Sequence, residues 1–180
     1  MPNWCEGSLK LRGKCTDILR FFEEGINAYE RVWENNEAQT KLIPKEEWCE
    51  IEEFDWQEEF NCEMVISNRL KSSGWIYIEG SDRAFINEDF CSYNIFRDKN
   101  DTDCVFALPF KQAWSIRQQD WIDIAKKYNL EIKIFGIESG TGFWCSLHIL
   151  KDGVIVENSF IQYQDYKDYV WNCPLPWMGG

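Results

Sequence analysis

The sequence has a single histidine, His148, and no two of its eight cysteines are spaced as a C-x-x-C pair. Zinc motifs with short ligand spacings and centres with several histidines are therefore excluded. A nucleophile activated by histidine would have to use His148, which shares a strand face with Trp144 and Ser146, whereas Cys145 points to the opposite face. We therefore predict no metal, no cofactor and no catalytic residue, and interpret His148 as an ordinary strand histidine.

Long apolar runs are absent as well, and none approaches the length of a membrane span. Residues 1–6 lack the basic and apolar segments of a signal peptide. We therefore expect a cytoplasmic protein whose eight cysteines are reduced and mostly buried.

Basic residues are scarce between residues 23 and 63, where Arg31, Lys41 and Lys45 stand against 14 acidic residues. This segment carries −11 of the formal net charge of −12, so the rest of the chain is nearly neutral. A charge concentrated in one segment makes one surface electronegative, and this surface repels polyanions and attracts cationic partners. The alternative is a solvated charged face with no partner.

The acidic segment is also rich in apolar residues, unlike a disordered acidic tail. After Pro44, the stretch 45–56 fits a helix with Glu46, Glu50 and Glu53 on one stripe. Trp48, Ile51 and Phe54 fall on the other side. We therefore predict one domain over residues 1–180, with an acidic, helical insertion at 34–63.

The remaining elements mix helices and strands. A strand at 8–12 precedes a helical pattern from Thr16 to Trp33, in which Gly25 marks a bend or a break. A second helix is predicted after Ser115, with Gln118 completing a capping box. Strands at 131–137, 143–150 and 154–161 follow, and Asp152-Gly153 predicts a hairpin between the last two. This order favours an α+β fold with an antiparallel sheet covered by helices.

Three stretches resemble one family: residues 2–13 with the helix after them, residues 108–128, and residues 138–153. Together they are similar to the YubB-like family of phage- and plasmid-borne proteins. The resemblance implies a ferredoxin-like domain and a mobile-element setting, but no reaction and no catalytic residues. Ile116-Arg117 stands where that family usually has two prolines. Trp4, Trp114 and Trp121 match the family's aromatic positions, and we expect them to pack between helix and sheet.

Direct binding of nucleic acid is opposed by the total charge, although Lys10, Arg12, Lys14 and Arg20 form a small basic cluster. One acid per three residues of a helix is one charge per about 4.5 Å. A single nucleic-acid strand carries one per about 3.4 Å. The acidic segment is therefore a candidate mimic of nucleic acid.

We expect a binding protein rather than an enzyme: a phage or plasmid accessory protein that acts in the cytoplasm of the host bacterium and inhibits a defence factor. A nucleic-acid-guided nuclease with a basic groove is the favoured target, as for an anti-CRISPR protein. Two alternatives stay open, namely a protein or enzyme with a pocket for a nucleotide signal on the sheet, and a structural or regulatory phage protein. The predicted contact residues are Glu46, Glu47, Trp48, Glu50, Glu53, Asp55, Trp56, Glu58 and Glu59.

Overall fold

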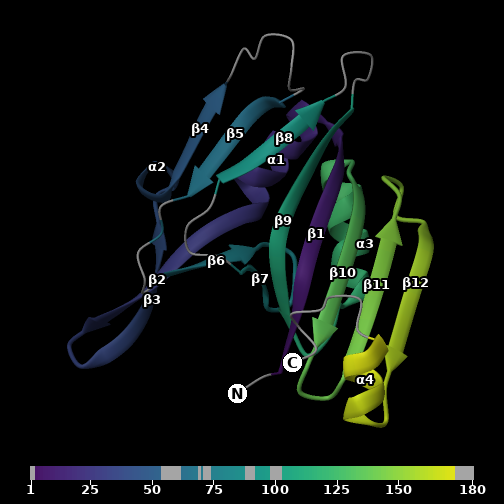
Figure 1. The fold of residues 1–180 in the computed structure, drawn as a ribbon. Coiled ribbons are helices and arrows are strands. Elements are labelled where there is room, and N and C mark those ends of the chain that lie inside the picture. The colour runs from purple at the N-terminus through teal and green to yellow at the C-terminus, as the bar shows by residue number, and fades with distance from the viewer. Residues whose placement is uncertain are drawn as a thin grey trace.

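The computed structural model describes residues 3–53, 62–68, 70, 74–87, 92–97 and 103–172, and it is built mainly from antiparallel strands (Figure 1). The strands are β1 (Trp4–Lys14), β2 (Ile26–Glu34), β3 (Glu37–Ile43), β4 (Cys49–Glu53), β5 (Cys62–Asn68), β6 (Gly74–Ile78), β7 (Ala84–Ile86), β8 (Ser92–Arg97), β9 (Asp103–Ala113), β10 (Glu131–Glu138), β11 (Phe143–Ile149) and β12 (Ile155–Gln162). The helices are α1 (Cys15–Gly25), α2 (Lys45–Trp48), α3 (Gln118–Tyr128) and α4 (Tyr166–Asn172).

The sheet forks at β9. Nine of the described strands follow the order β12-β11-β10-β1-β9-β7-β6-β2-β3. The first half of β9 pairs instead with β8, which pairs with β5, which pairs with β4. The two branches therefore leave one edge of β9 and carry β3 and β4 away from the central strands (Figure 1).

The two faces of the central sheet differ in what covers them. Leu9 and Leu11 of β1 are fully buried, whereas Lys10 and Arg12, which alternate with them, are exposed. This alternation is the signature of a strand with one covered face. The covered face packs against α1 and α3, which contribute Ile18, Phe21, Phe22, Trp121, Ile124 and Tyr128 to the core.

Gly25 is the last residue of α1, and no larger residue fits there. A Cβ placed there would lie 2.8 Å from the ring of Phe21 and 3.0 Å from the hydroxyl of Tyr128. The chain then becomes extended, and Ile26, Tyr29, Val32 and Trp33 lie in β2. These β-branched and aromatic residues favour a strand, so the expected helix from Thr16 to Trp33 is confirmed only as far as Gly25.

The prediction of a ferredoxin-like sheet covered by helices is wrong. The described residues form a large antiparallel sheet with few helices, and α1 and α3 cover only part of one face. The second predicted helix begins at Gln118, not directly after Ser115, and it lacks a side-chain cap. Trp121 is buried as expected, but Trp114 is 59% exposed and has a φ of 72°. The hairpin of β11 and β12 is confirmed.

The acidic helical insertion is also corrected. Among the described residues of the insertion, only Lys45–Trp48 are helical, and the chain then enters β4, where Ile51 pairs with Ile66 of β5. Glu46, Glu50 and Glu53 therefore do not share a helical stripe. Pairing with β5 overrides the helix propensity of this segment. Asp55, Trp56, Glu58 and Glu59 lie outside the described residues.

Candidate functional site

Three predicted contact residues surround one hollow. Glu46, Glu47 and Glu50 are exposed, and together with Trp48 and Cys49 they line a hollow of about 330 Å³. We call Glu46, Glu47 and Glu50 the acidic surface. They lie on α2 and the start of β4, which are packed elements, so their carboxylates are carried at fixed places on the body.

Trp48 anchors this segment and is not an exposed contact, which corrects the prediction. Its side chain is 2% exposed, and its ring lies 6.2 Å from that of Phe22 in α1. Burial of so large an aromatic side chain stabilises the docking of α2 on the core.

Lys45 points into the body and away from the acidic surface. Its Nζ donates hydrogen bonds to the backbone carbonyls of Phe22, Glu23 and Ile26, at 2.8 Å for Glu23 and 2.6 Å for Ile26. These carbonyls belong to the end of α1 and the start of β2, where a cation satisfies free acceptors and complements the helix dipole. Burial lowers the pKa of Lys45. The only base between residues 42 and 63 is thus held by carbonyl oxygens.

The hairpin of β2 and β3 carries less net charge than the acidic surface. Glu34 forms an ion pair with Lys41, and Glu30 stands opposite Lys41 in the register. The hairpin exposes apolar side chains instead, with Trp33 72% exposed and Leu42 58% exposed. Trp33, which the sequence pattern assigned to a helix stripe, is therefore an exposed aromatic residue of this hairpin.

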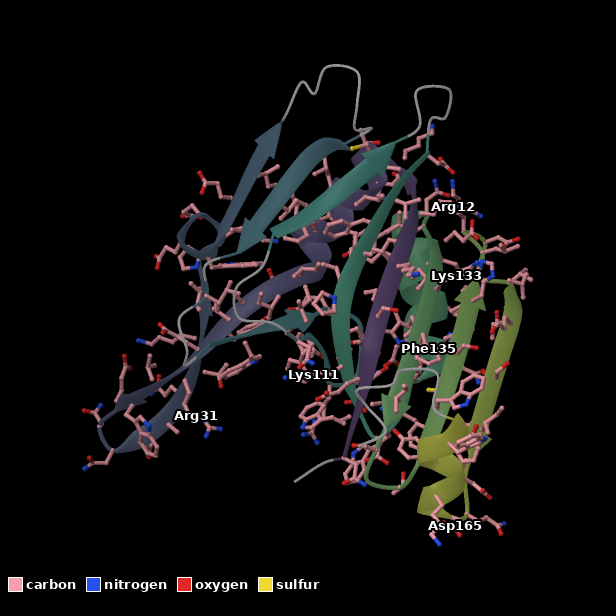
Figure 2. All side chains as sticks on the ribbon, viewed as in Figure 1. Arg12, Arg31, Lys111, Lys133, Phe135 and Asp165 are labelled. Carbon is pink, nitrogen blue, oxygen red and sulfur yellow. The ribbon has the colours of Figure 1, made fainter. Side chains whose placement is uncertain are left out.

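The opposite face of the central sheet, away from α1 and α3, gathers basic and aromatic side chains, and we call it the open face. Figure 2 shows Arg12, Lys111, Lys133 and Phe135 on this face. They come from β1, β9 and β10, which are far apart in sequence and adjacent in the sheet. Their gathering was not visible in the sequence because it depends on strand order and register.

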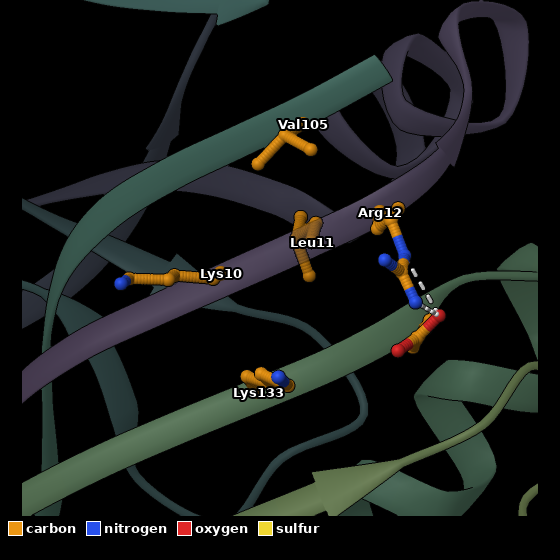
Figure 3. Close-up of a pocket in the computed structure, with 6 residues that line it drawn as sticks. Lys10, Leu11, Arg12, Val105 and Lys133 are labelled. Carbon is orange, nitrogen blue, oxygen red and sulfur yellow. Dashed lines mark hydrogen bonds and ion pairs between the residues drawn. The ribbon is translucent and has the colours of Figure 1, made fainter. Parts of the chain in front are cut away.

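Lys10 of β1 and Lys133 of β10 are directly opposite each other in the register, and both are exposed. Like charges at such a position destabilise a sheet. Two shallow hollows, of about 180 Å³ and about 150 Å³, share both lysines in their linings. Figure 3 shows the first hollow, with Val105 of β9 beside the two strands.

Glu131 lies next to this pair but is already engaged. Oε2 accepts hydrogen bonds from Arg12 at 2.8 Å and 2.5 Å (Figure 3). Oε1 lies 2.6 Å from Nε2 of His148. Burial favours the protonated acid, but the bonds from Arg12 and His148 outweigh it and lower the pKa of Glu131. The carboxylate of Glu131 therefore interacts with Arg12 and His148.

Aromatic rings lie on the open face to either side of Glu6, which is four residues along β1 from Lys10. Trp4, Phe85, Tyr77, Tyr29 and Trp75 form a chain of ring contacts with centroid distances between 5.4 and 6.4 Å. On the other side, the rings of Phe135 and Trp144 lie 5.9 Å apart. All seven are half-buried, so each also presents part of its surface to solvent. Lys111 and Arg83 lie 5.6 Å and 5.9 Å from the ring centre of Trp4.

His148 lies on β11 and shares the open face with Trp144 and Ser146, as predicted. Within the described ranges, no three His, Cys, Asp or Glu side chains group as metal ligands. Among the cysteines with described side chains, Cys5, Cys49 and Cys145 are free thiols. The sulfurs of Cys5 and Cys145 lie 3.6 Å apart, and this contact, with burial, raises the pKa of Cys5.

No helix in the described part of the chain is both long and apolar enough to cross a membrane. No protein-family model, curated protein or solved structure matches the chain. The resemblance to the YubB-like family therefore stays a prediction.

Proposed function

We propose that this chain is a binding protein, not an enzyme, and that its acidic surface docks on a cationic partner. The observation that carries the proposal is the arrangement around Trp48: Glu46, Glu47 and Glu50 are exposed around one hollow, while Trp48 and Lys45 turn inward. Carboxylates held on packed elements lose less conformational freedom on binding than those of a flexible tail.

The partner that fits this surface is a protein with a basic groove for nucleic acid. Our proposed target is a nucleic-acid-guided nuclease of a bacterial host. This protein would be a phage- or plasmid-borne inhibitor that binds the nuclease in the host cytoplasm. The strand geometry changes the form of the mimicry. Side chains on one face of a strand recur about every 6.6 Å, twice the rise of about 3.3 Å per residue, so the acidic surface resembles a polyanion by its clustered charge and not by the phosphate spacing of one strand, about 3.4 Å.

The test uses a triple variant, Glu46→Gln, Glu47→Gln and Glu50→Gln. The matched control is Glu23→Gln, Glu24→Gln and Glu37→Gln, which removes the same charge from exposed residues outside the hollow. DNA cleavage by a panel of purified RNA-guided nucleases is measured with the parent and both variants, at several salt concentrations.

The parent should inhibit at least one nuclease, and inhibition should weaken as salt rises. The triple variant should inhibit less, chiefly through slower association, and the control should inhibit like the parent. Equal inhibition by the triple variant and the parent at every salt concentration would refute a role for the acidic surface. Absence of inhibition across the panel would refute the proposed target class.

A further inference from the structure

We propose that the open face binds single-stranded nucleic acid, with Lys10 and Lys133 contacting phosphates and the aromatic rings of the same face stacking on bases. This site is distinct from the acidic surface. It uses β1, β9, β10 and β11, whereas the acidic surface uses α2 and β4.

The case for a polyanion begins with the lysine pair. Two lysines directly opposite each other repel in the free protein. On one side they meet uncharged residues of β9, Val105 and Ala107, which are both exposed. A phosphate between the lysines would turn this repulsion into two charge-assisted contacts.

The acids near the lysines have other partners. Glu131 accepts from Arg12 and His148, and the Oε1 of Glu157 accepts from the hydroxyl of Ser146. Within the described residues that line the two hollows, three bases, Lys10, Arg12 and Lys133, stand against two acids, Glu131 and Glu157, which leaves one positive charge in excess. The local charge favours an anion although the whole chain is acidic.

The case for bases rests on the rings. Bases stack on aromatic side chains, at about 1–3 kcal/mol per base, only when the strand is unpaired. Phe85 of the five-ring chain and Trp144 lie in one cross-strand row, which passes through Lys111, Glu6 and Ile137. Phe135 lies two residues from Lys133 on β10, on the side of the lysines toward this row. From β7, which carries Phe85, to β11, which carries Trp144, there are four strand spacings. At 4.8 Å each, this is about 19 Å.

The shape favours an extended strand over a small ligand. The two hollows measure about 180 and 150 Å³. Pockets that enclose a small molecule are larger, at about 300–1,000 Å³. Shallow hollows with charges and rings spread across several strands fit a ligand that lies along the surface.

The acidic surface lies far enough from Lys10 and Lys133 to permit binding of a polyanion there. β4 is separated from β1 by four pairings along the sheet, through β5, β8 and β9. That path is about 19 Å at 4.8 Å per strand. The Debye length is about 8 Å at physiological salt, so most of the repulsion from the acidic surface is screened at the lysines.

Fluorescence anisotropy with labelled 12-nucleotide single strands of DNA and RNA tests the proposal on the full chain. The variant is Lys10→Gln with Lys133→Gln, and the control is Lys126→Gln with Lys127→Gln, which removes the same charge from exposed positions on α3. A second variant, Phe135→Leu, keeps an apolar side chain and removes one ring. Circular dichroism melts establish that each variant is folded.

The parent should bind a single strand in 50 mM salt and bind a 12-base-pair duplex more weakly. The lysine variant should lose at least tenfold in affinity, and the slope of log K against log salt should shrink by about 1.4 for two lost phosphate contacts. Phe135→Leu should lose about threefold or more without a change in that slope. The α3 control should stay within twofold of the parent.

Three results would overturn the proposal. One is a parent that binds neither DNA nor RNA single strands in 50 mM salt. Another is a lysine variant that binds as well as the α3 control. The third is competition by inorganic phosphate or a mononucleotide at the same molar concentration as the strand, which would assign the site to a small anion.

Discussion

The acidic surface and the open face show two ways in which a chain gathers charge. The acids come from a continuous stretch of sequence, and Glu46, Glu47 and Glu50 would be neighbours in almost any fold. The bases of the open face come from β1, β9 and β10, and only the register brings Lys10 beside Lys133. A sum over the whole chain hides the second kind of cluster, so a net charge of −12 did not exclude a cationic face.

The burial of Trp48 beneath the acidic surface predicts the largest change in stability. Trp48→Ala should destabilise the protein by about 3–5 kcal/mol because it removes a buried ring. Trp33→Ala should cost less than about 0.5 kcal/mol because that ring is exposed. Urea unfolding followed by circular dichroism measures both. A similar cost for the two variants would mean that Trp48 is not the anchor of the acidic surface.

The variant Glu131→Gln tests whether the contacts of Glu131 with Arg12 and His148 stabilise the open face. Glu131→Gln should destabilise the protein by about 1–2 kcal/mol, because the bonds from Arg12 and His148 lose their charged acceptor. It should also strengthen binding of a single strand, since one negative charge leaves the open face.

The pH dependence of this variant has a definite sign. The pKa of Glu131 in the folded protein lies below its ordinary value of 4.5. Its stabilising contribution is therefore present above pH 4.5 and is lost as the pH falls through the lowered value. Unfolding at pH 6, 4.5 and 3 should show the gap between parent and Glu131→Gln narrowing toward acid. A gap that widens toward acid would contradict the lowered pKa.

The lysine pair gives a smaller effect of opposite sign. Lys10→Gln with Lys133→Gln should raise stability by about 0.2–1 kcal/mol because like-charge repulsion is relieved. Lys111 provides the contrast, since it stands opposite Glu6 in the register and near the ring of Trp4. Lys111→Gln should lower stability by a similar amount. Thermal melts that show both variants destabilised would remove the evidence that the lysine pair is strained in the free protein.

The acidic surface should give the smallest change in stability. Glu46→Gln, Glu47→Gln and Glu50→Gln together should alter the free energy of unfolding by no more than about 0.5 kcal/mol, as is usual for exposed positions. Urea unfolding of this variant beside the parent measures the difference. A loss above 1 kcal/mol would show that these carboxylates stabilise the fold, and a reduced inhibition would then have a structural cause.

Local chemistry made parts of the fold predictable from sequence. The Asp152-Gly153 turn set the β11–β12 hairpin, and Gly25 marked the end of α1. Residues 26–33 and 49–53 were assigned to helices because their local spacing fits one, yet pairing of β2 with β6 and of β4 with β5 makes them strands. Such pairing joins residues distant in sequence, which local periodicity does not register.

The candidate sites follow the same division. The positions of Glu46, Glu47 and Glu50 on the surface could be predicted, because charge avoids burial. The burial of Trp48 could not, since it depends on Phe22 across the core. The open face was missed because no segment of the sequence carries more than two or three of its side chains.

Single-strand binding by three proteins, measured in one salt titration, tests the separation of the two surfaces most directly. The proteins are the parent, Lys10→Gln with Lys133→Gln, and Glu46→Gln with Glu47→Gln and Glu50→Gln. The lysine variant should lose at least tenfold in affinity for the 12-nucleotide strand. The acidic-surface variant should stay within about threefold of the parent at physiological salt, because its charges lie more than a Debye length away along the sheet. If neutralising the acidic surface changes strand binding as much as removing the lysine pair, the two regions are not separate and the assignment of two binding surfaces is wrong.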